Sequence, residues 1–418
     1  MKKEITTDEH RLEQMEPNKK KLPEGWEWKK LGEVCEVIGG GTPSKKVKEF
    51  YNGNIPWATV RDMQGEIIQK TECKITEEAV KKSSTNIIPK NNVIIATRVG
   101  LGKVCLLNKD TAINQDLRGI IPKNNNYLYV PFLFRWFKSI SNRIIEEGTG
   151  ATVKGVKLPF IKDLSIPLPP LSEQKRIVAI LDEAFAAIDK ARANAEKNLA
   201  NAKELFESYL NGIFANPRED WEEKKLGEIC EFVRGPFGGS LKKSIFRPSG
   251  YAVYEQQHAI NNQFENIRYF IDEIKFNKMK RFELKAGDLI MSCSGTMGRT
   301  AIVPETFHKG IINQALLKLT PQNSLSVHFL KLWMESNDFL KQIAKHSQGA
   351  AIKNVSSVKT LKNIRLKLPS MKTQNEIIEK TDSFSGITIR LKEIYQKKIS
   401  AFEDLKKSFL KKAFEGEL

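Results

Sequence analysis

The chain has 418 residues, of which 40% are hydrophobic, and its formal net charge is +18. A chain of this length exceeds one hydrophobic core and predicts about two to four compact units. No apolar run approaches the roughly 18 residues that cross a membrane, and residues 1–21 are too polar for a signal peptide. We therefore expect a flexible N-terminal tail over residues 1–21 and a cytoplasmic protein.

The positive charge is concentrated outside two long segments of the chain. Residues 171–215 hold six Lys/Arg and seven Asp/Glu, and residues 371–418 hold ten and eight. Their net charges of −1 and +2 leave +17 on the remainder of the chain. A field of this size attracts a polyanion, of which nucleic acid is the usual one. The alternative is a charge that serves solubility alone.

Residues 22–170 predict a first globular unit of mixed α/β (α+β) type. Its turns are rich in glycine and proline, and the proline-rich block at residues 167–170 ends it. Strand-like runs occur at Asn92–Thr97 and Leu117–Ile121, and a helical pattern occurs at Val130–Ile144.

A long helix is predicted over residues 171–216. Ser172 is its expected N-cap, and Glu173 lies in the first turn, where a negative charge is favourable. Apolar residues then recur at spacings of three and four over about forty residues, or roughly 60 Å of helix. Pro217 ends the pattern. This heptad-like stripe predicts packing against another long helix.

The second part of the chain repeats the first. Residues 26–36 and 221–231 are identical at nine of eleven positions, and further matches run to the C-terminus. They predict a second globular unit over residues 217–370 and a second long helix over residues 371–418, which Gly386 weakens. In the second unit, strand-like runs occur at Gly287–Ser292 and Ile311–Leu319, and a helical pattern occurs at His328–Ala344.

Several of these motifs resemble the DNA-specificity subunit of type I restriction-modification systems. In the first half they are Leu22–Glu33, Gly41–Ser44 followed by Ile55–Trp57, and the Pro-Leu-Pro-Pro-Leu-Ser-Glu-Gln block with its sequel at Pro167–Ile177. In the second half, Gly235–Gly238 and Tyr254–Gln257 resemble another common subtype of target domain. The resemblance covers nearly the whole chain after residue 21.

The resemblance implies a non-catalytic subunit that binds double-stranded DNA and no membrane. Two target recognition domains would each read one half of a split, asymmetric site. Two antiparallel helices would form a coiled-coil spacer that sets the distance between them and docks methyltransferase subunits. Two methyltransferase (M) and two restriction/translocase (R) subunits would assemble around this chain. S-adenosylmethionine, ATP and Mg²⁺ are expected on those partners, and no cofactor on this chain.

One departure from the family pattern lies at the start of the second long helix. Ser370 stands where the first copy has Pro170, and the following segment Lys372–Asn375 is degenerate. This difference predicts weaker docking of the second partner.

Residues that read DNA are expected near the stretches where the two halves differ, at 45–90 and 240–285. Phosphate contacts call for Lys and Arg, and base contacts call for Arg, Asn, Gln or acidic side chains. In each half two lysines follow a glycine-rich turn, and a polar segment lies further along the chain, at Trp57–Asp62 in the first half and Gln256–His258 in the second. Two matching turns, Arg98–Lys103 and Ser294–Arg299, are suited to clamping phosphates. The candidate residues are Lys45, Lys46, Trp57, Arg61, Asp62, Arg98 and Lys103 in the first half, and Lys242, Lys243, Gln256, Gln257, His258, Ser294 and Arg299 in the second.

Each of these assignments has a structural alternative. The glycine turns could be plain hairpins, Trp57 could belong to the core, and Arg61 with Asp62 could form a local ion pair. The pairs Asn114-Gln115 and Asn313-Gln314 occur in both halves, so we expect them to satisfy backbone groups rather than to read bases.

The sequence offers no catalytic or metal site. It contains no Gly-x-x-x-x-Gly-Lys-Ser/Thr loop, no Asn/Asp-Pro-Pro-aromatic motif and no Cys-x-x-Cys pair, and its five histidines lack metal-ligand spacing. Cys35 and Cys230 occupy matching positions and predict buried residues. The remaining alternatives are a non-catalytic assembly scaffold and a self-sufficient DNA methyltransferase or nuclease. A DNA mimic is disfavoured because it would be acidic.

Overall fold

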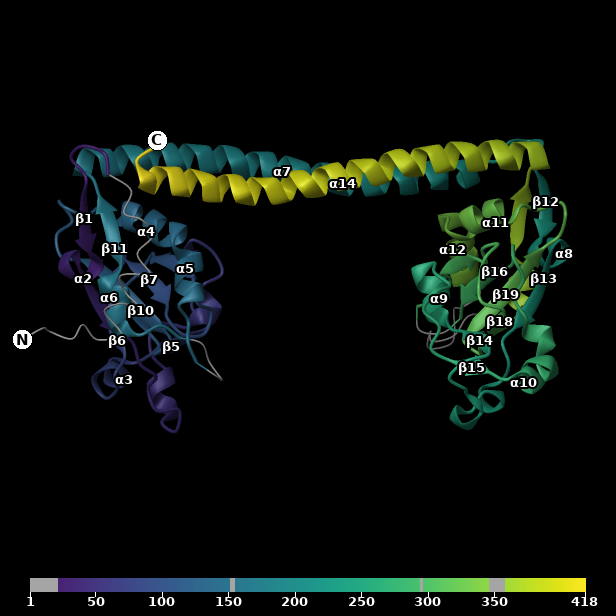
Figure 1. Cartoon of the computed structure of the whole chain (residues 1–418), viewed down its shortest axis with the longest axis horizontal. Helices are drawn as coiled ribbons and strands as arrows, with labels where there is room; N and C mark the ends of the chain where they lie inside the picture. The colour runs from purple at the N-terminus through teal and green to yellow at the C-terminus, as the bar shows by residue number, and fades with distance from the viewer. Residues whose placement is uncertain (1–21, 151–154, 294–295, 346–357) are drawn as a thin grey trace, which may run out of the picture. The chain divides into compact units, whose positions relative to one another are not determined.

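The computed structural model divides into two compact units (Figure 1). The first contains the chain up to Asn194 together with Lys398–Leu418, and the second contains Ala195–Lys397. The structure describes residues 22–150, 155–293, 296–345 and 358–418, so the tail predicted over residues 1–21 lies outside the described residues. Within the described ranges, no helix has the length and apolar character of a membrane span.

The first unit contains two main sheets. One has five strands in the order β2 (Cys35–Gly39), β10 (Leu117–Pro122), β7 (Val93–Ala96), β8 (Val104–Leu107) and β4 (Ile67–Ile68). The other has four strands in the order β5 (Cys73–Ile75), β3 (Ile55–Ala58), β9 (Thr111–Ile113) and β6 (Asn86–Ile88). In the first sheet β2, β10, β7 and β8 are antiparallel neighbours, whereas β4 is parallel to β8.

A separate two-stranded ladder links the beginning and the end of this unit. β1 (Glu27–Lys30) pairs antiparallel with β11 (Ser165–Leu168), so that Glu27 faces Leu168. The helices of the unit are α2 (Leu31–Val34), α3 (Glu77–Lys81), α4 (Val130–Ser139), α5 (Ser141–Glu146) and α6 (Leu158–Asp163), with single 3-10 turns η1 (Lys48–Tyr51) and η2 (Val60–Asp62).

The second unit has the same plan with fewer strands. Its main sheet has the order β13 (Cys230–Arg234), β19 (Leu316–Pro321), β16 (Leu289–Ser292) and β17 (Thr300–Ile302). A smaller sheet has the order β15 (Phe270–Ile271), β14 (Tyr251–Tyr254) and β18 (Gly310–Ile312), and a ladder joins β12 (Glu222–Lys225) to β20 (Arg365–Leu368). Its helices are α8 (Leu226–Ile229), α9 (Gln256–Asn261), α10 (Glu273–Lys278), α11 (Val327–Met334), α12 (Asn337–Lys345) and α13 (Val358–Lys362), with η3 (Gly238–Ser240), η4 (Lys243–Ile245) and η5 (Lys280–Phe282).

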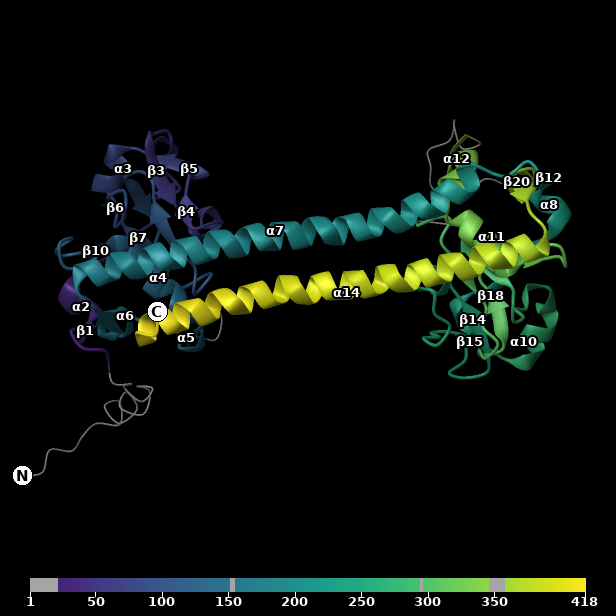
Figure 2. The same cartoon turned by 90° about the horizontal axis from the view of Figure 1, so that it is seen from above.

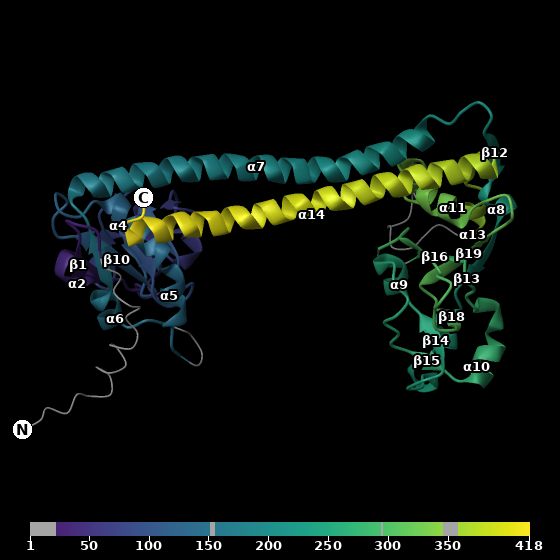
Figure 3. The same cartoon turned by 45° about the horizontal axis from the view of Figure 1, so that its top comes forward.

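Two 45-residue helices, α7 (Leu171–Ala215) and α14 (Met371–Glu415), contribute to both units. In the first unit Arg192 pairs with Glu403 and Asp189 with Lys406, so the helices run antiparallel there. In the second unit the rings of Tyr209 and Phe384 lie 4.7 Å apart. Figure 2 and Figure 3 show the two helices side by side within each unit.

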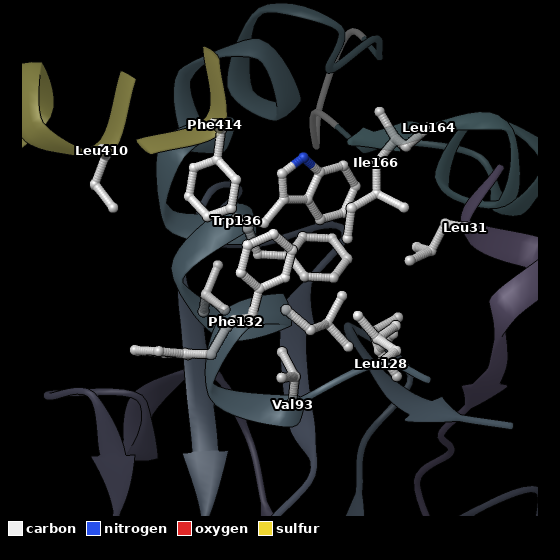
Figure 4. Packing of buried hydrophobic residues seen from close by; sticks show 14 of the residues in the cluster. Leu31, Val93, Leu128, Phe132, Trp136, Leu164, Ile166, Leu410 and Phe414 are labelled. Atoms are coloured by element: carbon white, nitrogen blue, oxygen red, sulfur yellow. The ribbon is translucent and has the colours of Figure 1, made fainter. Parts of the chain in front are cut away.

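The core of each unit is completed by the end of a long helix that began in the other half of the sequence. In the first unit, Phe414 of α14 packs on Phe132 of α4, with ring centroids 5.1 Å apart (Figure 4). In the second, Phe214 of α7 packs on Phe329 of α11 at 5.5 Å. These phenylalanines, each 8% exposed or less, contribute roughly 1.5–3 kcal/mol apiece through burial.

The predicted fold class is confirmed: two mixed α/β units combine with two long helices that pack antiparallel within each unit. Three predicted elements are split, and one of them is the pattern His328–Ala344, which forms α11 and α12 with the hydroxyl of Ser336 donating to the carbonyl of Trp333 at the break. The run Ile311–Leu319 forms β18 and β19, because Asn313 accepts a hydrogen bond from the amide of Ala315 and turns the chain. The pattern Val130–Ile144 forms α4 and α5, and the hydroxyl of Ser139 donates to the carbonyl of Trp136 at the break.

One predicted helix cap needs correction. α7 begins at Leu171, and the amides of Glu173 and Gln174 both donate to the carbonyl of Pro170, so Ser172 is not the N-cap. In α14 the hydroxyl of Ser370 accepts a hydrogen bond from the amide of Thr373. The replacement of Pro170 by Ser370 therefore gives the second helix a side-chain cap that the first lacks.

Candidate nucleic-acid interface

A hollow of about 750 Å³ opens on the surface of the first unit. It lies between the turn that follows β2, the β3–η2 segment and the turn after β9, and thus beside the divergent stretch 45–90. Its lining combines cationic Lys45, Lys48 and Arg61 with acidic Glu72 and Asp116. Three of the predicted site residues, Lys45, Trp57 and Arg61, are brought together here.

The side chains of Arg61 and Asp62 have different roles. Asp62 accepts hydrogen bonds from the amides of Thr59 and Glu72, at 2.7 and 2.8 Å, and so fixes the η2 turn. Arg61 is 82% exposed and reaches Glu72 only at 3.9 Å. The structural alternative, a local ion pair between Arg61 and Asp62, is therefore wrong. Arg61 remains available to a ligand, whereas Asp62 is committed to the turn.

Trp57 belongs to the core of its sheet. It is 6% exposed, its indole N–H donates to the carbonyl of Gly41 at 3.2 Å, and Tyr51 packs edge-on against its ring. A ring held in this way offers no open face to a nucleic-acid base. Trp57 is therefore a core residue, which is the structural alternative to a DNA contact.

The turn between β7 and β8 brings two further predicted cations to the same surface. Gly100 and Gly102 adopt positive φ values of 72° and 83°, which glycine accommodates without strain. Lys103 then donates to the carbonyl of Val60 at 3.5 Å, beside Arg61, and Arg98 pairs with Asp116 at 3.4 Å on the rim of the hollow. Lys45 and Lys46 are exposed on the neighbouring turn.

In the second unit, Lys242 and Lys243 are exposed at the start of η4. The loop before them carries Phe237, whose side chain is 92% exposed. Sequence reasoning did not single out this residue, although its place in the glycine loop was the available signal. The matching residue of the first unit is Thr42, whose hydroxyl bonds Gln115.

The predicted segment Gln256–His258 forms the first turn of α9. His258 is fully buried, and its Nδ1 lies 2.9 Å from the backbone nitrogen of Glu255, so it cannot contact DNA and that prediction is wrong. Its Nε2 is buried without a hydrogen-bond partner among the described residues. Gln257 is half-buried and donates to Glu255 and to the carbonyl of Asn266 at 3.5 and 3.4 Å. Gln256 is half-buried as well.

The remaining predicted turn in the second unit is described only in part. Arg299 is exposed, and its backbone amide donates to the hydroxyl of Ser292 at 3.0 Å. Ser294 lies outside the described residues. The guanidinium-bearing residue of this turn is therefore open to solvent.

The glycine turns approach the protein's own backbone. A Cβ atom on Gly40 would lie 2.2 Å from the carbonyl oxygen of Asn114, and one on Gly235 would lie 1.8 Å from that of Asn313. The side chains of these asparagines accept hydrogen bonds from the amides of Asp116 and Ala315. The expectation that Asn114 and Asn313 satisfy backbone groups is confirmed.

Two buried glutamines, matched in the repeat, clamp the long helices onto the units. Gln174 is fully buried; it accepts from the amide of Tyr129 and donates to the carbonyls of Tyr127 and Pro169, all within 2.9 Å. Gln374 makes the equivalent bonds to Ser326, Ser324 and Pro369 at the same distances. The recurrence of this glutamine was the sequence signal for its structural role.

Four of the five cysteines behave as core residues, whereas Cys73 is exposed. Cys35 and Cys230 are each 2% exposed, as predicted, and burial raises the pKa of both thiols to about 12. Burial also raises the pKa of Cys105 and Cys293 to about 11. All four stay protonated near neutral pH and are poor nucleophiles. Among the described residues, no group of three or more His, Cys, Asp or Glu side chains could hold a metal ion.

The sequence model of the type I restriction modification DNA specificity domain matches residues 23–197 and 218–401. The chain is 29% identical to the type I restriction enzyme MjaIX specificity subunit of Methanocaldococcus jannaschii, over 71% of this chain and 74% of that protein. It is 34% identical to the EcoR124I/EcoR124II specificity subunit of Escherichia coli, over 46% of this chain and 49% of that protein.

Solved structures share the fold. A chain from a study of complex assembly and conformational transition in the type I R-M system superposes with a TM-score of 0.75 at 22% identity, covering 95% of this chain and all of that one. The HsdS subunit from Thermoanaerobacter tengcongensis superposes with a TM-score of 0.64 at 21% identity, covering 96% and 99% of the two chains.

Proposed function

The chain belongs to the type I restriction modification DNA specificity domain family, and from this membership we propose how it serves as the sequence-specificity subunit of such a system. Residues 22–170 and 217–370 are the two target recognition domains. Each reads one half of a bipartite, asymmetric DNA site. The helices over residues 171–216 and 371–418 set the spacing between the halves.

One observation carries this proposal: each unit combines a scaffold that recurs in the other unit with a surface segment that differs between the two units. The ladders β1–β11 and β12–β20, the glutamine clamps and the glycine turns recur in both units. The segments beside them differ: η2 with the exposed Arg61 lies in one unit, and α9 with the half-buried Gln256 and Gln257 lies in the other. Two related modules with different reading surfaces suit a site whose halves differ in sequence.

The long helices supply the proposed docking surface for the methyltransferase subunits. Within the second unit α14 exposes Ile387, Ile389 and Ile394 by 53, 51 and 47%, and α7 exposes Leu205 by 52%. Exposed aliphatic side chains on a helix pair favour helical partners. Two M and two R subunits complete the proposed assembly, which acts in the cytoplasm.

Catalysis is assigned to those partners. S-adenosylmethionine, ATP and Mg²⁺ bind to them in this proposal, and this chain contributes no catalytic group. The buried, protonated cysteines support that division, because none of the four offers an activated nucleophile. A self-sufficient methyltransferase is distinguished by incubating the purified chain alone with labelled S-adenosylmethionine and DNA, where transfer of label contradicts the proposal.

Genome-wide mapping of methylated adenines tests the function directly. Cells that carry the gene are compared with cells that lack it, in the presence of the partner subunits. We expect one bipartite motif, with a fixed gap, to lose methylation on deletion. Replacing residues 240–285 by the equivalent segment of a relative is expected to change one half of the motif only. A continuous motif, or a change in both halves, contradicts the proposal.

A further inference from the structure

The second unit holds one arginine in an unusually fixed position on its surface. Arg268 binds Glu255 through two parallel hydrogen bonds, Nε to Oε2 and Nη2 to Oε1, each 2.9 Å long. The Glu255 side chain is 14% exposed, whereas the Arg268 side chain is 61% exposed. The carboxylate is thus embedded at the start of α9, and the guanidinium extends from it toward solvent.

An aromatic stack supports the same guanidinium from the side. Its central carbon lies 5.4 Å from the ring centroid of Tyr269, and that ring stacks on Phe246 at 4.4 Å with an interplanar angle of 23°. Phe246 directly follows η4, which begins at Lys243. This stack therefore connects Arg268 to the segment that carries the exposed lysines proposed to contact DNA.

These contacts distinguish Arg268 from an ordinary surface ion pair. Exposed pairs are usually loose and contribute little to stability. In the first unit, for example, Arg61 meets Glu72 through one contact of 3.9 Å. The paired hydrogen bonds and the ring contact instead fix the plane of the Arg268 guanidinium before any ligand binds. A fixed plane reduces the conformational entropy that binding must overcome.

The pairing with Glu255 leaves several N–H donors of Arg268 able to bind a ligand. Two of the five N–H groups of Arg268 bind Glu255, which leaves the outer edge of the guanidinium with donors in a planar fork. In the DNA major groove only guanine presents two acceptors, O6 and N7, that match such a fork. Lysine cannot reproduce this geometry, because its ammonium is a point charge on a flexible stem.

We propose that Arg268, held by Glu255, reads a guanine in the half-site bound by the second unit. Glu255 is a positioning residue in this arrangement. The inference rests on the proposed function, since it needs the second unit to contact DNA. Sequence reasoning missed both residues, because Arg268 lies thirteen positions from its partner and only the fold brings them together.

The test uses the full chain assembled with its methyltransferase partners and duplexes that carry the mapped motif. Binding is measured for the motif and for every single base-pair change in it. We expect Arg268→Ala to lower discrimination at one guanine of one half-site by roughly 10- to 100-fold, without effect on the other half-site. Arg268→Lys is expected to lose the same discrimination while keeping the charge. Glu255→Gln is expected to give an intermediate loss at the same position.

A modified base sharpens the assignment. Replacing that guanine by 7-deazaguanine removes the N7 acceptor and is expected to weaken wild-type binding, but not to weaken binding of Arg268→Ala further. Arg247→Ala is the matched control, because Arg247 flanks the same stack and pairs with Asp272 at 3.2 Å. It is expected to weaken all duplexes alike.

The outcomes separate this inference from the function. A wild-type complex without a bipartite preference contradicts the proposed function. A bipartite preference with no guanine in the affected half-site, or with base discrimination unchanged in Arg268→Ala and Arg268→Lys, overturns only the role of Arg268. Thermal unfolding of each variant accompanies the binding measurement, and Arg268→Lys provides the decisive result where Arg268→Ala fails to fold.

Discussion

Between β2 and β7, the first unit forms four short strands and α3, whereas the second unit forms two strands, α9 and α10 between β13 and β16. Outside these segments the two units agree closely. In each unit the backbone amide of the first residue of a short helix, α2 or α8, donates to the carbonyl of the residue just before the last strand, β11 or β20. The amide of Leu31 donates to Leu164, and that of Leu226 to Ile364, both at 2.8 Å.

This difference shows where the fold tolerates change. The second sheet loses a strand and the main sheet loses its β4 edge in the second unit, yet the ladder, the glutamine clamp and the glycine turn are unaltered. A scaffold closed by its own backbone bonds permits a variable segment beside it. The core cluster that joins the main sheet to the long helices in each unit contains no residue of 45–90 or 240–285, and these stretches pack in separate, smaller clusters.

The largest expected effect concerns the aromatic contacts that complete each core. Phe414→Ala removes the ring that packs on Phe132, and we expect it to destabilise the first unit by about 3 kcal/mol. Hydrogen exchange monitored by mass spectrometry should show lost protection in β7, β10 and α4, with little change in β16 and β19.

Phe214→Ala is the matched variant and should give the mirror-image result in the second unit, since Phe214 packs on Phe329. Equal loss of protection in both units from either variant contradicts the comparison, because it means that the two cores unfold as one.

The glutamine clamps come next in expected size. Gln174→Ala leaves the buried carbonyl of Pro169 and the part-buried amide of Tyr129 and carbonyl of Tyr127 without this partner, which costs about 1–3 kcal/mol for a buried group. Gln374→Ala should cost a similar amount, because its three bonds have the same lengths. Thermal denaturation of both variants measures this, and Gln115→Ala, at the surface of the first unit, is the control. A cost that differs between the clamps by more than about 2 kcal/mol contradicts their equivalence.

A smaller effect should separate phosphate contacts from base contacts in the second unit. Lys242 is exposed beside the divergent segment, and Lys242→Ala is expected to weaken binding to all duplexes and to reduce the salt slope by about 1. Gln257→Ala is expected to relax one half-site only. Binding at several salt concentrations distinguishes the two. A footprint with unchanged preference at both half-sites rejects the role of Gln257.

The repeat explains why much of the scaffold could be predicted from the sequence. Identical stretches such as residues 26–36 and 221–231 lie in the ladder and the first turn of each unit, where backbone pairing fixes their form. The heptad-like stripes predicted both long helices, because an amphipathic period of this length has few other solutions. The prediction of Ser172 as the N-cap was wrong, because the carbonyl of Pro170 accepts the first amide hydrogen bonds of α7 and no side-chain cap is needed.

The reading surface was harder to predict, because it depends on contacts between residues far apart in the chain. His258 stood in a polar stretch, yet the fold places it under Glu255 with its ring against Tyr254. Glu255 and Arg268 become a pair only when β14 and the segment after α9 are brought together. Polar composition alone could not distinguish Asp62, which fixes a turn, from Arg61, which stays exposed.

The smallest expected effect concerns the stability of α14. Gly386 lies inside α14, and a Cβ atom there would meet nothing within 4 Å. Gly386→Ala should therefore stabilise the second unit by roughly 0.5–1 kcal/mol, because alanine restricts the unfolded chain and favours the helix. Gly235→Ala should have the opposite sign, since its Cβ would lie 1.8 Å from the carbonyl oxygen of Asn313. Chemical denaturation of both variants measures the pair. A destabilising Gly386→Ala would contradict the open space that the structure gives this glycine.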